Sequence, residues 1–502
     1  MVLACLQSAA VLGVEAHLVS VEVDVSFGLP QFNMVGLPDA TVRESRDRVR
    51  AAIRNSGFDF PQHRITVNLA PADLRKAGSS FDLSIAIGLL AAGEVVTRRA
   101  IDDTIVLGEL SLDGGINAVR GVLPVAAAAR RLGVRRLLLP PQNAPEACVI
   151  DGLDVCAVRS LQEAVEALNA PETVPLIARD RAEPVRTDEP DLSEVRGQIV
   201  ARRAIEVAAA GGHNLLMTGP PGSGKTMLAR RMGSVLPDMT LDEAIECTQI
   251  HSVAGQLPPG VGLLSSRPFR APHHTVSNVA LVGGGGIPRP GEISLAHQGV
   301  LFLDELPEFE RRVLDALRQP IEEGRVAIAR AAAHVVFPCR FMLVAAMNPC
   351  PCGYAGSDRQ PCRCTPPQVS AYASRVSGPL RDRFDLSIVL SHVPVDALSE
   401  GDGAEPSAVV RNRVVHAREI QRQRAAGRAA VTNALLRGPG LLRYCRPDTQ
   451  GAVRLARAVE VFGLSARGYH RVLRVARTIA DLEGATAVAD AHVAEALQFR
   501  SA

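Results

Sequence analysis

The stretch Gly219-Pro220-Pro221-Gly222-Ser223-Gly224-Lys225-Thr226 follows the short apolar run 215–217 and precedes a helical pattern at 227–232. It fits the pattern G-x-x-x-x-G-K-[ST] in the strand–loop–helix setting that this pattern requires. Its glycines let backbone N–H groups converge on phosphate oxygens, and the N-terminus of the helix adds partial positive charge. We therefore predict that residues 219–226 bind ATP, with Lys225 at the outer phosphates and the hydroxyl of Thr226 on Mg²⁺.

Two further apolar runs end in polar side chains that complete such a site. Residues 300–303 end in Asp304 and Glu305, and residues 341–347 end in Asn348. We predict that Asp304 binds Mg²⁺ together with Thr226, and that Glu305 orients or deprotonates the attacking water. Asn348 is predicted to position this water beside the γ-phosphate; the alternative is that it caps a turn before Pro349.

The chain of 502 residues is too long for one hydrophobic core, and its pattern divides it into three blocks. Block 1–170 alternates strand-like runs (19–25, 64–69 and 135–140) with helical segments such as 40–56. Residues 171–194, with four prolines, have the composition of a linker. Block 195–395 has the strand-then-helix rhythm of a parallel α/β sheet, and block 396–502 is helical after a second linker-like stretch at 397–406.

The composition excludes several classes of protein. Hydrophobic residues make up 47% and charged residues 22%, as in an ordinary globular protein. No apolar run approaches the ~20 residues of a membrane span, and the N-terminus lacks the basic leader of a secreted protein. Ten cysteines in this length do not make a disulfide scaffold. We expect a cytoplasmic protein with reduced thiols, with no membrane partner and no small-molecule substrate besides ATP.

Four of the cysteines, Cys350, Cys352, Cys362 and Cys364, lie on one glycine-bearing stretch. Four thiolates at this spacing are able to hold a structural Zn²⁺. The C-x-C pairs are tighter than the usual C-x₂₋₄-C pairs, so reduced or redox-active thiols remain the alternative.

Positive charge is supplied almost entirely by arginine, since Lys76 and Lys225 are the only lysines. Segment 405–478 carries fifteen arginines against four acidic residues, which indicates either contact with DNA phosphates or solvated helix faces.

The three strand ends resemble the Walker A, Walker B and sensor 1 motifs of AAA+ ATPases. Further segments narrow the resemblance to the YifB/ComM family of magnesium-chelatase-like ATPases: 36–39, 68–73, 191–197, 267–275, 288–292, 348–353 and 476–482. The resemblance spans essentially the whole chain. It implies an N-terminal ribosomal-S5/Lon-protease-like α+β domain (1–170), a linker (171–194), an AAA+ parallel-sheet core (195–395) and a C-terminal helical lid of the magnesium-chelatase type (396–502).

The resemblance also implies a ring, expected to be a hexamer. Residues 378–385 resemble the segment with the arginine finger, which assigns that role to Arg383, with Arg381 and Arg375 as contenders. Arg467 matches sensor 2 and would contact the γ-phosphate. The glycine run 283–286 lies in an insertion that forms pore-facing hairpins in this branch, or else is a surface loop without contacts. His273 and His274 are expected to be structural or interface residues.

Residues 76–83 and 108–114 resemble the Lon protease domain, with Ser80 at the nucleophile position. A serine nucleophile needs a base, and the segment 120–126, where this domain has a lysine, contains none. A dyad of Ser80 with Lys76 is the remaining alternative; we expect a non-proteolytic scaffold.

The resulting prediction is a DNA motor, as the family resemblance implies a hexameric helicase that promotes branch migration during natural transformation. A chelatase-type motor that remodels a partner for metal insertion and a protein-remodelling ring are the alternatives.

Overall fold

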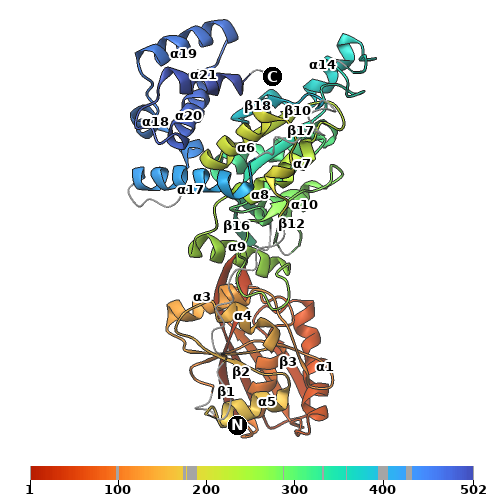
Figure 1. The fold of residues 1–502 in the computed structure, drawn as a ribbon. Helices are drawn as coiled ribbons and strands as arrows, with labels where there is room; N and C mark the ends of the chain where they lie inside the picture. Colours follow the sequence, from red (N-terminus) through yellow and green to blue (C-terminus); the bar gives the residue numbers. More distant parts are fainter. Residues whose placement is uncertain are drawn as a thin grey trace.

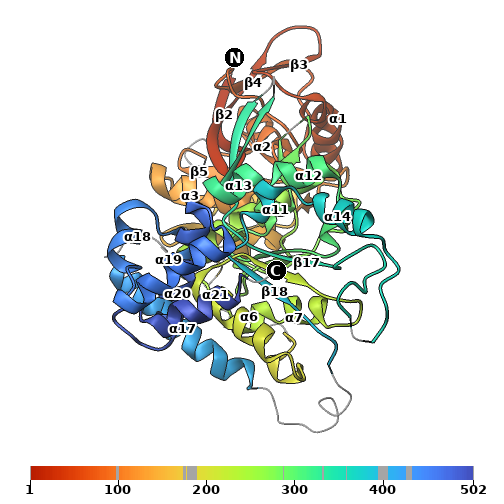
Figure 2. The same cartoon turned by 90° about the horizontal axis from the view of Figure 1, so that it is seen from above.

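The computed structural model describes residues 2–97, 101–172, 177, 189–286, 288–330, 333–357, 359–393, 405–425 and 432–500. Three bodies follow one another along the chain: a seven-stranded sheet with helices, a five-stranded parallel sheet with helices, and a group of helices (Figure 1). Seen from above, the helical group lies beside the parallel-sheet body (Figure 2).

The first body is built on the sheet order β3-β4-β2-β1-β5-β8-β9. In β2 every second residue from Val19 to Val23 is buried, as expected of a strand that packs a helix on one face. All eleven residues of α2 are buried, so this helix forms the centre of the core. The elements are β1 (Val2–Leu12), β2 (Glu15–Ser26), β3 (Gln31–Val35), α1 (Ala40–Asn55), β4 (Arg64–Ala70), α2 (Asp82–Ala92), β5 (Thr104–Val106), β6 (Glu109–Leu110), β7 (Ile116–Asn117), α3 (Val122–Leu132), β8 (Arg136–Leu139), η2 (Pro141–Asn143), α4 (Ala144–Ala147), β9 (Asp154–Ala157) and α5 (Leu161–Asn169).

The second body has the parallel order β11-β14-β17-β10-β18. Strand β14 sends Val300 and Phe302 into the core on one face of the sheet, and Leu301 and Leu303 into the core on the other face. The elements are η3 (Leu192–Glu194), α6 (Ile199–Gly211), β10 (Leu215–Thr218), α7 (Lys225–Arg230), α8 (Met232–Val235), α9 (Leu241–Ala254), β11 (Phe269–Arg270), α10 (Asn278–Val282), β12 (Gly283–Gly284), β13 (Arg289–Pro290), α11 (Glu292–Leu295), β14 (Val300–Leu303), η4 (Leu306–Glu308), α12 (Arg311–Ala316), α13 (Arg318–Glu323), β15 (Arg325–Arg330), β16 (Ala333–Pro338), β17 (Met342–Met347), α14 (Pro366–Ser374), α15 (Gly378–Arg381) and β18 (Leu386–Val389).

The third body contains helices α17 (Ser407–Arg424), η5 (Asn433–Leu435), α18 (Gly438–Tyr444), α19 (Thr449–Phe462), α20 (Ala466–Leu482) and α21 (Asp490–Gln498). Apolar side chains of α17 and α20, such as Val414 and Ile479, belong to the same core as α6 and strand β10. The helical group is therefore packed onto one face of the parallel sheet.

The first body contacts the opposite face. The turn between β1 and β2 reaches the β15–β16 hairpin, and its neighbours Leu12 and Val14 pack against the core on that face. Helix α9 makes a second contact, in which the Ser252 hydroxyl donates to the buried carboxylate of Glu146 at 2.6 Å. Burial raises the pKa of Glu146.

The strands and helices expected from the sequence are present, with one difference. The helix expected at 227–232 begins at Lys225 and divides near Arg231 into α7 and α8. Both predicted linkers, 171–194 and 397–406, lie mostly outside the described residues. Among the helices that the structure describes, none is long and apolar enough to cross a membrane.

Candidate nucleotide site

The strand order brings three strand ends together. Strand β17 lies between β10 and β14 in the sheet, although it follows both in the sequence. Because the strands are parallel, their carboxyl ends share one edge of the sheet. The loop 219–226 after β10, the pair Asp304 and Glu305 after β14, and Asn348 after β17 therefore meet there.

Lys225 is buried, and its ammonium group forms hydrogen bonds with carbonyl oxygens of its own loop. Its Nζ donates to the carbonyl oxygens of Gly219 at 2.7 Å and Pro220 at 2.9 Å, and to Oδ1 of Asn348 at 3.2 Å. Burial lowers the pKa of Lys225, and the nearby carboxylates Asp304 and Glu305 oppose this shift. A phosphate group would compete with these oxygens for the ammonium group.

The two predicted Mg²⁺ ligands are in direct contact. The Thr226 hydroxyl donates to Oδ2 of Asp304 at 2.6 Å. A hydroxyl and a carboxylate oxygen beside a phosphate-binding loop are the donor set that Mg²⁺ takes in nucleotide sites. These residues therefore fit the ion.

Glu305 adopts a left-handed backbone conformation, with φ of 51°. Its carboxylate is exposed, and its Oε2 lies 3.4 Å from Nδ1 of His274. The His274 ring packs in a tilted arrangement against His273, with 4.1 Å between the ring centroids. His274 follows β11, the edge strand of the sheet, and thus joins the predicted catalytic carboxylate to the insertion before β12. The contact between Glu305 and His274 was not predicted from the sequence.

Gln198 is a second residue that sequence reasoning missed. Its Nε2 donates to the carbonyl oxygen of Ser223 at 3.2 Å and to that of Ser391 at 2.7 Å. It thereby ties the phosphate loop to the segment after β18. The signal was present, since Gln198 directly follows the conspicuous stretch 191–197.

Arg383 and Arg467 are not part of this cluster. Arg383 precedes β18, which runs parallel to β10. It therefore lies at the amino-terminal ends of the strands, whereas the loop 219–226 lies at their carboxyl ends. Its side chain is 11% exposed, and its guanidinium pairs with Glu322 at 2.5 Å. Arg467 is exposed at the start of α20. One turn later Arg471 donates to the Phe384 carbonyl oxygen at 3.0 Å, which docks α20 beside Arg383.

The four clustered cysteines are close together in space. Their Sγ atoms all lie within 4.8 Å of one another, and three pairs are 3.3, 3.6 and 3.7 Å apart. A tetrahedral ion with Zn–S bonds of about 2.3 Å holds its sulfurs about 3.8 Å apart. Backbone N–H groups of Ala355 and Cys364 point at the sulfurs of Cys350 and Cys362. The donor set and its spacing fit Zn²⁺, and no disulfide joins any of the ten cysteines, all of which lie in the described residues.

The insertion contains the expected hairpin. Gly283–Gly284 pairs antiparallel with Arg289–Pro290, and Arg270 at its base forms a two-bond ion pair with Glu292. Ile287, which lies between the two strands in the sequence, is outside the described residues.

Most arginines of segment 405–478 are engaged inside the molecule. Arg424 and Arg477 pair with Asp481, Arg413 pairs with Glu206, and others pair likewise. The excess of arginine is therefore in large part structural, and by itself is not a footprint of DNA.

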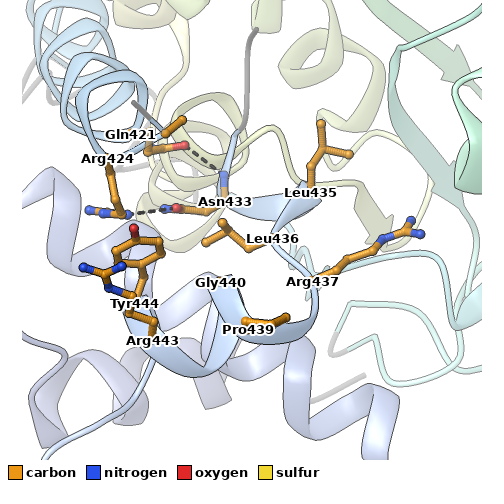
Figure 3. Close-up of a pocket in the computed structure, with 11 residues that line it drawn as sticks. Gln421, Arg424, Asn433, Leu435, Leu436, Arg437, Pro439, Gly440, Arg443 and Tyr444 are labelled. Carbon is orange, nitrogen blue, oxygen red and sulfur yellow. Dashed lines mark hydrogen bonds between the residues drawn. The ribbon is translucent and has the colours of Figure 1, made fainter. Parts of the chain in front are cut away.

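A cavity lies away from the phosphate loop, in the helical group (Figure 3). It has a volume of about 630 Å³ and lies between α17, η5 and α18. Arg424 and Arg443 flank the ring of Tyr444, and Asn433 joins Gln421 and Arg424 by hydrogen bonds. Arg437 and Arg443 form no ion pair with any carboxylate in the described part of the chain.

In the first body, Lys76 is fully buried and its Nζ donates to the carbonyl oxygen of Pro71. Burial lowers the pKa of Lys76. Within the described residues it forms no hydrogen bond with Ser80, whose backbone carbonyl accepts from Gly108. The geometry does not support a Ser80–Lys76 dyad.

Comparison with known proteins covers the whole chain. Family profiles described as "Magnesium chelatase, subunit ChlI", "Subunit ChlI of Mg-chelatase" and "Magnesium chelatase, subunit ChlI C-terminal" match residues 191–398, 21–143 and 404–500. The chain is 48% identical to competence protein ComM of Haemophilus influenzae over 507 residues, covering 100% of this chain and 98% of that protein. It is 45% identical to the uncharacterized protein YifB of Escherichia coli K12, covering 100% and 97%. A more distant similarity, 27% over 313 residues, joins 56% of this chain to 77% of the magnesium-chelatase 38 kDa subunit of Rhodobacter capsulatus. The chain therefore belongs to the YifB/ComM family of magnesium-chelatase-like AAA+ ATPases.

Proposed function

We propose that this chain is an ATP-hydrolysing ring motor that acts on DNA as a ComM-like branch-migration helicase. The observation that carries the ATPase is the meeting of Lys225, Thr226, Asp304, Glu305 and Asn348 at one edge of the sheet. The identity with competence protein ComM over the whole chain supports DNA as the substrate.

Each of these side chains has a distinct role in the proposal. Residues 219–224 cradle the phosphates with backbone N–H groups, and the ammonium of Lys225 binds the outer phosphates. Thr226 and Asp304 would hold Mg²⁺, which when bound neutralises phosphate charge. Glu305 accepts a proton from the attacking water, and Asn348 holds this water in line with the γ-phosphate.

Two substitutions separate binding from hydrolysis. Lys225→Ala is expected to abolish ATP binding, because it removes the ammonium group that binds the outer phosphates in this proposal. Glu305→Gln keeps the shape of the site, so we expect ATP binding to persist while turnover falls about 100-fold or more. Turnover that survives in Lys225→Ala would overturn the site assignment.

The DNA substrate is tested by measuring turnover and binding with single-stranded, duplex and four-way-junction DNA. We expect at least one form to bind in the presence of ATP and to change turnover. If no form does either, the DNA motor is wrong, and the alternative of a chelatase-type or protein-remodelling ATPase is favoured. The matches to three magnesium-chelatase profiles support this second candidate.

We propose that the chain assembles into a homo-oligomeric ring, a hexamer, in which Arg383 acts on the ATP of the neighbouring subunit and Arg467 contacts the γ-phosphate. The position of Arg383 at the far edge of its own sheet supports action in trans. Mixing Arg383→Ala chains with Glu305→Gln chains should restore turnover, because some interfaces then hold one intact Glu305 and one intact Arg383. If each single variant is inactive and the mixture stays inactive, Arg383 does not act in trans.

We also propose a structural Zn²⁺ on Cys350, Cys352, Cys362 and Cys364. Their sulfur spacing and the N–H groups directed at two of the sulfurs support it. Metal analysis of the purified protein should give one zinc per chain, and Cys362→Ser should lose it. A wild-type chain without zinc would favour reduced or redox-active thiols instead.

The remaining assignments complete the proposal. Residues 1–170 are proposed to form a non-proteolytic Lon/S5-like domain, which the buried Lys76 contact supports. Residues 171–194 are proposed as linker, 195–395 as the AAA+ core and 396–502 as the lid, and the insertion hairpin at 283–290 is proposed to face the pore. We propose a cytoplasmic location, which the absence of disulfides among the described cysteines supports.

A further inference from the structure

The cysteine cluster and the nucleotide site share one strand end. Asn348, whose Oδ1 accepts from Lys225, is two residues from Cys350. Cys350 is fully buried, so the first sulfur of the cluster is anchored in the core beside the predicted catalytic amide. The groups that fix the positions of the sulfurs therefore also influence the orientation of the Asn348 side chain.

The backbone of residues 350–364 (the cysteine loop) packs directly on residues 219–226 (the phosphate loop). A Cβ added to Gly353 would lie 2.6 Å from Cδ and 2.8 Å from Cγ of Pro221. Gly353 also has a φ of 86°, and its N–H donates to the Cys350 carbonyl oxygen at 2.9 Å in a tight turn. At this distance the two loops are unable to move independently, because packed protein groups transmit displacement.

The middle of the cysteine loop contacts the segment after β18, which also borders the site. The Arg359 guanidinium donates to the Val393 carbonyl oxygen at 3.2 Å. Val393 is two residues from Ser391, whose carbonyl oxygen accepts from the same Gln198 amide that holds the Ser223 carbonyl. The cysteine loop thus spans from Pro221 to the segment after β18.

Beyond these contacts, little of the cysteine loop is buried. Apart from buried Cys350 and Gly353, the described residues of 350–364 are exposed or half-buried. A segment with so few apolar contacts is ordered most effectively by a cross-link, which a tetrahedral ion on four sulfurs supplies.

We propose that metal binding by the cysteine loop and nucleotide binding by the phosphate loop are thermodynamically coupled, through the contact of Gly353 with Pro221 and through Asn348. The metal-loaded loop holds Pro221 and Asn348 in the nucleotide-binding arrangement. Coupling of this kind is reciprocal, so bound nucleotide strengthens metal retention by the same factor. This inference rests on the proposed ATPase and zinc sites, and adds their linkage.

The first test uses the wild-type chain. The rate at which a chelator extracts zinc is measured with and without a non-hydrolysable ATP analogue and Mg²⁺. We expect saturating nucleotide to slow extraction about 10-fold. An unchanged rate in a chain that contains zinc and binds the analogue would overturn the coupling and leave both separate sites standing. Absence of zinc, or of nucleotide binding, would overturn the coupling together with the corresponding site.

The second test uses two matched glycine variants. Gly353 and Gly356 both have positive φ, of 86° and 74°, but a Cβ on Gly356 meets nothing within 4 Å. We expect Gly356→Ala to resemble the wild type, and Gly353→Ala to retain zinc while binding the analogue about 10-fold more weakly and losing the effect of nucleotide on extraction. Equal nucleotide affinity in the two variants would contradict the proposal.

Discussion

At the residue scale, single carboxylates organise the many arginines of this chain. Asp481 has no exposed side-chain surface and accepts from Arg424, Arg477 and Asn433. A buried carboxylate is tolerable only when its charge and lone pairs are matched, and here two guanidinium groups and an amide do so. The cluster joins α17, η5 and α20, and so maintains the helical group as a unit.

Removal of this charge is expected to destabilise the fold strongly. Asp481→Asn leaves the buried Arg477 and the half-buried Arg424 without their shared anion, which should lower the free energy of unfolding by about 3–5 kcal/mol. Urea unfolding followed by circular dichroism measures the loss. Asp490→Asn is the control, because Asp490 pairs with Arg454 in an ion pair that is 27% and 49% exposed. We expect the control to leave stability nearly unchanged, because solvent screens an exposed ion pair. Similar losses in both variants would refute the argument.

At the element scale, α9 links the nucleotide-binding body to the first body. It begins with a capping box between Thr240 and Glu243, and its last turns bury polar residues rather than an apolar stripe. Nε2 of His251 lies 3.1 Å from the Leu295 carbonyl oxygen, and Ser252 donates to Glu146. The position of α9 therefore depends on specific hydrogen bonds, which makes it sensitive to protonation.

His251 should make stability depend on pH. Burial lowers the pKa of His251 from its ordinary 6.5, so the neutral ring is favoured in the folded state. The stabilisation is complete above pH 6.5 and is lost as the pH falls through the lowered folded value. Thermal unfolding between pH 7.5 and 5.5 should show a steeper decline for the wild type than for His251→Gln, which keeps an N–H donor but does not titrate. Parallel declines would rule His251 out as the cause.

At the scale of the whole molecule, the interface between the first two bodies depends on a tight turn. Gly13, between β1 and β2, has a φ of 67°, and a Cβ there would lie 2.5 Å from Cγ1 of Val335 in β16. The hairpin tip is thus seated against β16 without room for a methyl group. This contact, with Glu146 and Ser252, connects the N-terminal sheet to the ATPase body.

The turn can be tested with another matched pair of glycines. Gly133 also has a positive φ, of 80°, but its added Cβ would meet nothing within 4 Å. Both alanine variants carry the backbone strain, whereas Gly13→Ala also overpacks the interface. We expect Gly13→Ala to lose about 1–3 kcal/mol more than Gly133→Ala in denaturant unfolding. An equal loss of stability in the two variants would mean that the interface accommodates the added methyl group without destabilisation.

Much of the local structure was predictable because its causes are local. Alternating burial in β2, the continuous apolar run of β14 and the glycine-rich loop before Lys225 each follow from residues adjacent in the chain. The identities of Lys225, Thr226, Asp304, Glu305 and Asn348 as a candidate set were likewise visible, since polar residues that end buried strands gather at one edge of a parallel sheet.

The sequence by itself determined which groups are available for nucleotide chemistry and on which strand ends they lie. Only the tertiary structure decided their contacts. Asn348 reaches Lys225, 123 residues away, because β17 inserts between β14 and β10. His274 meets Glu305 and Gly353 meets Pro221 for the same kind of reason. Strand order and close packing between distant segments depend on the whole core, so no local pattern records them.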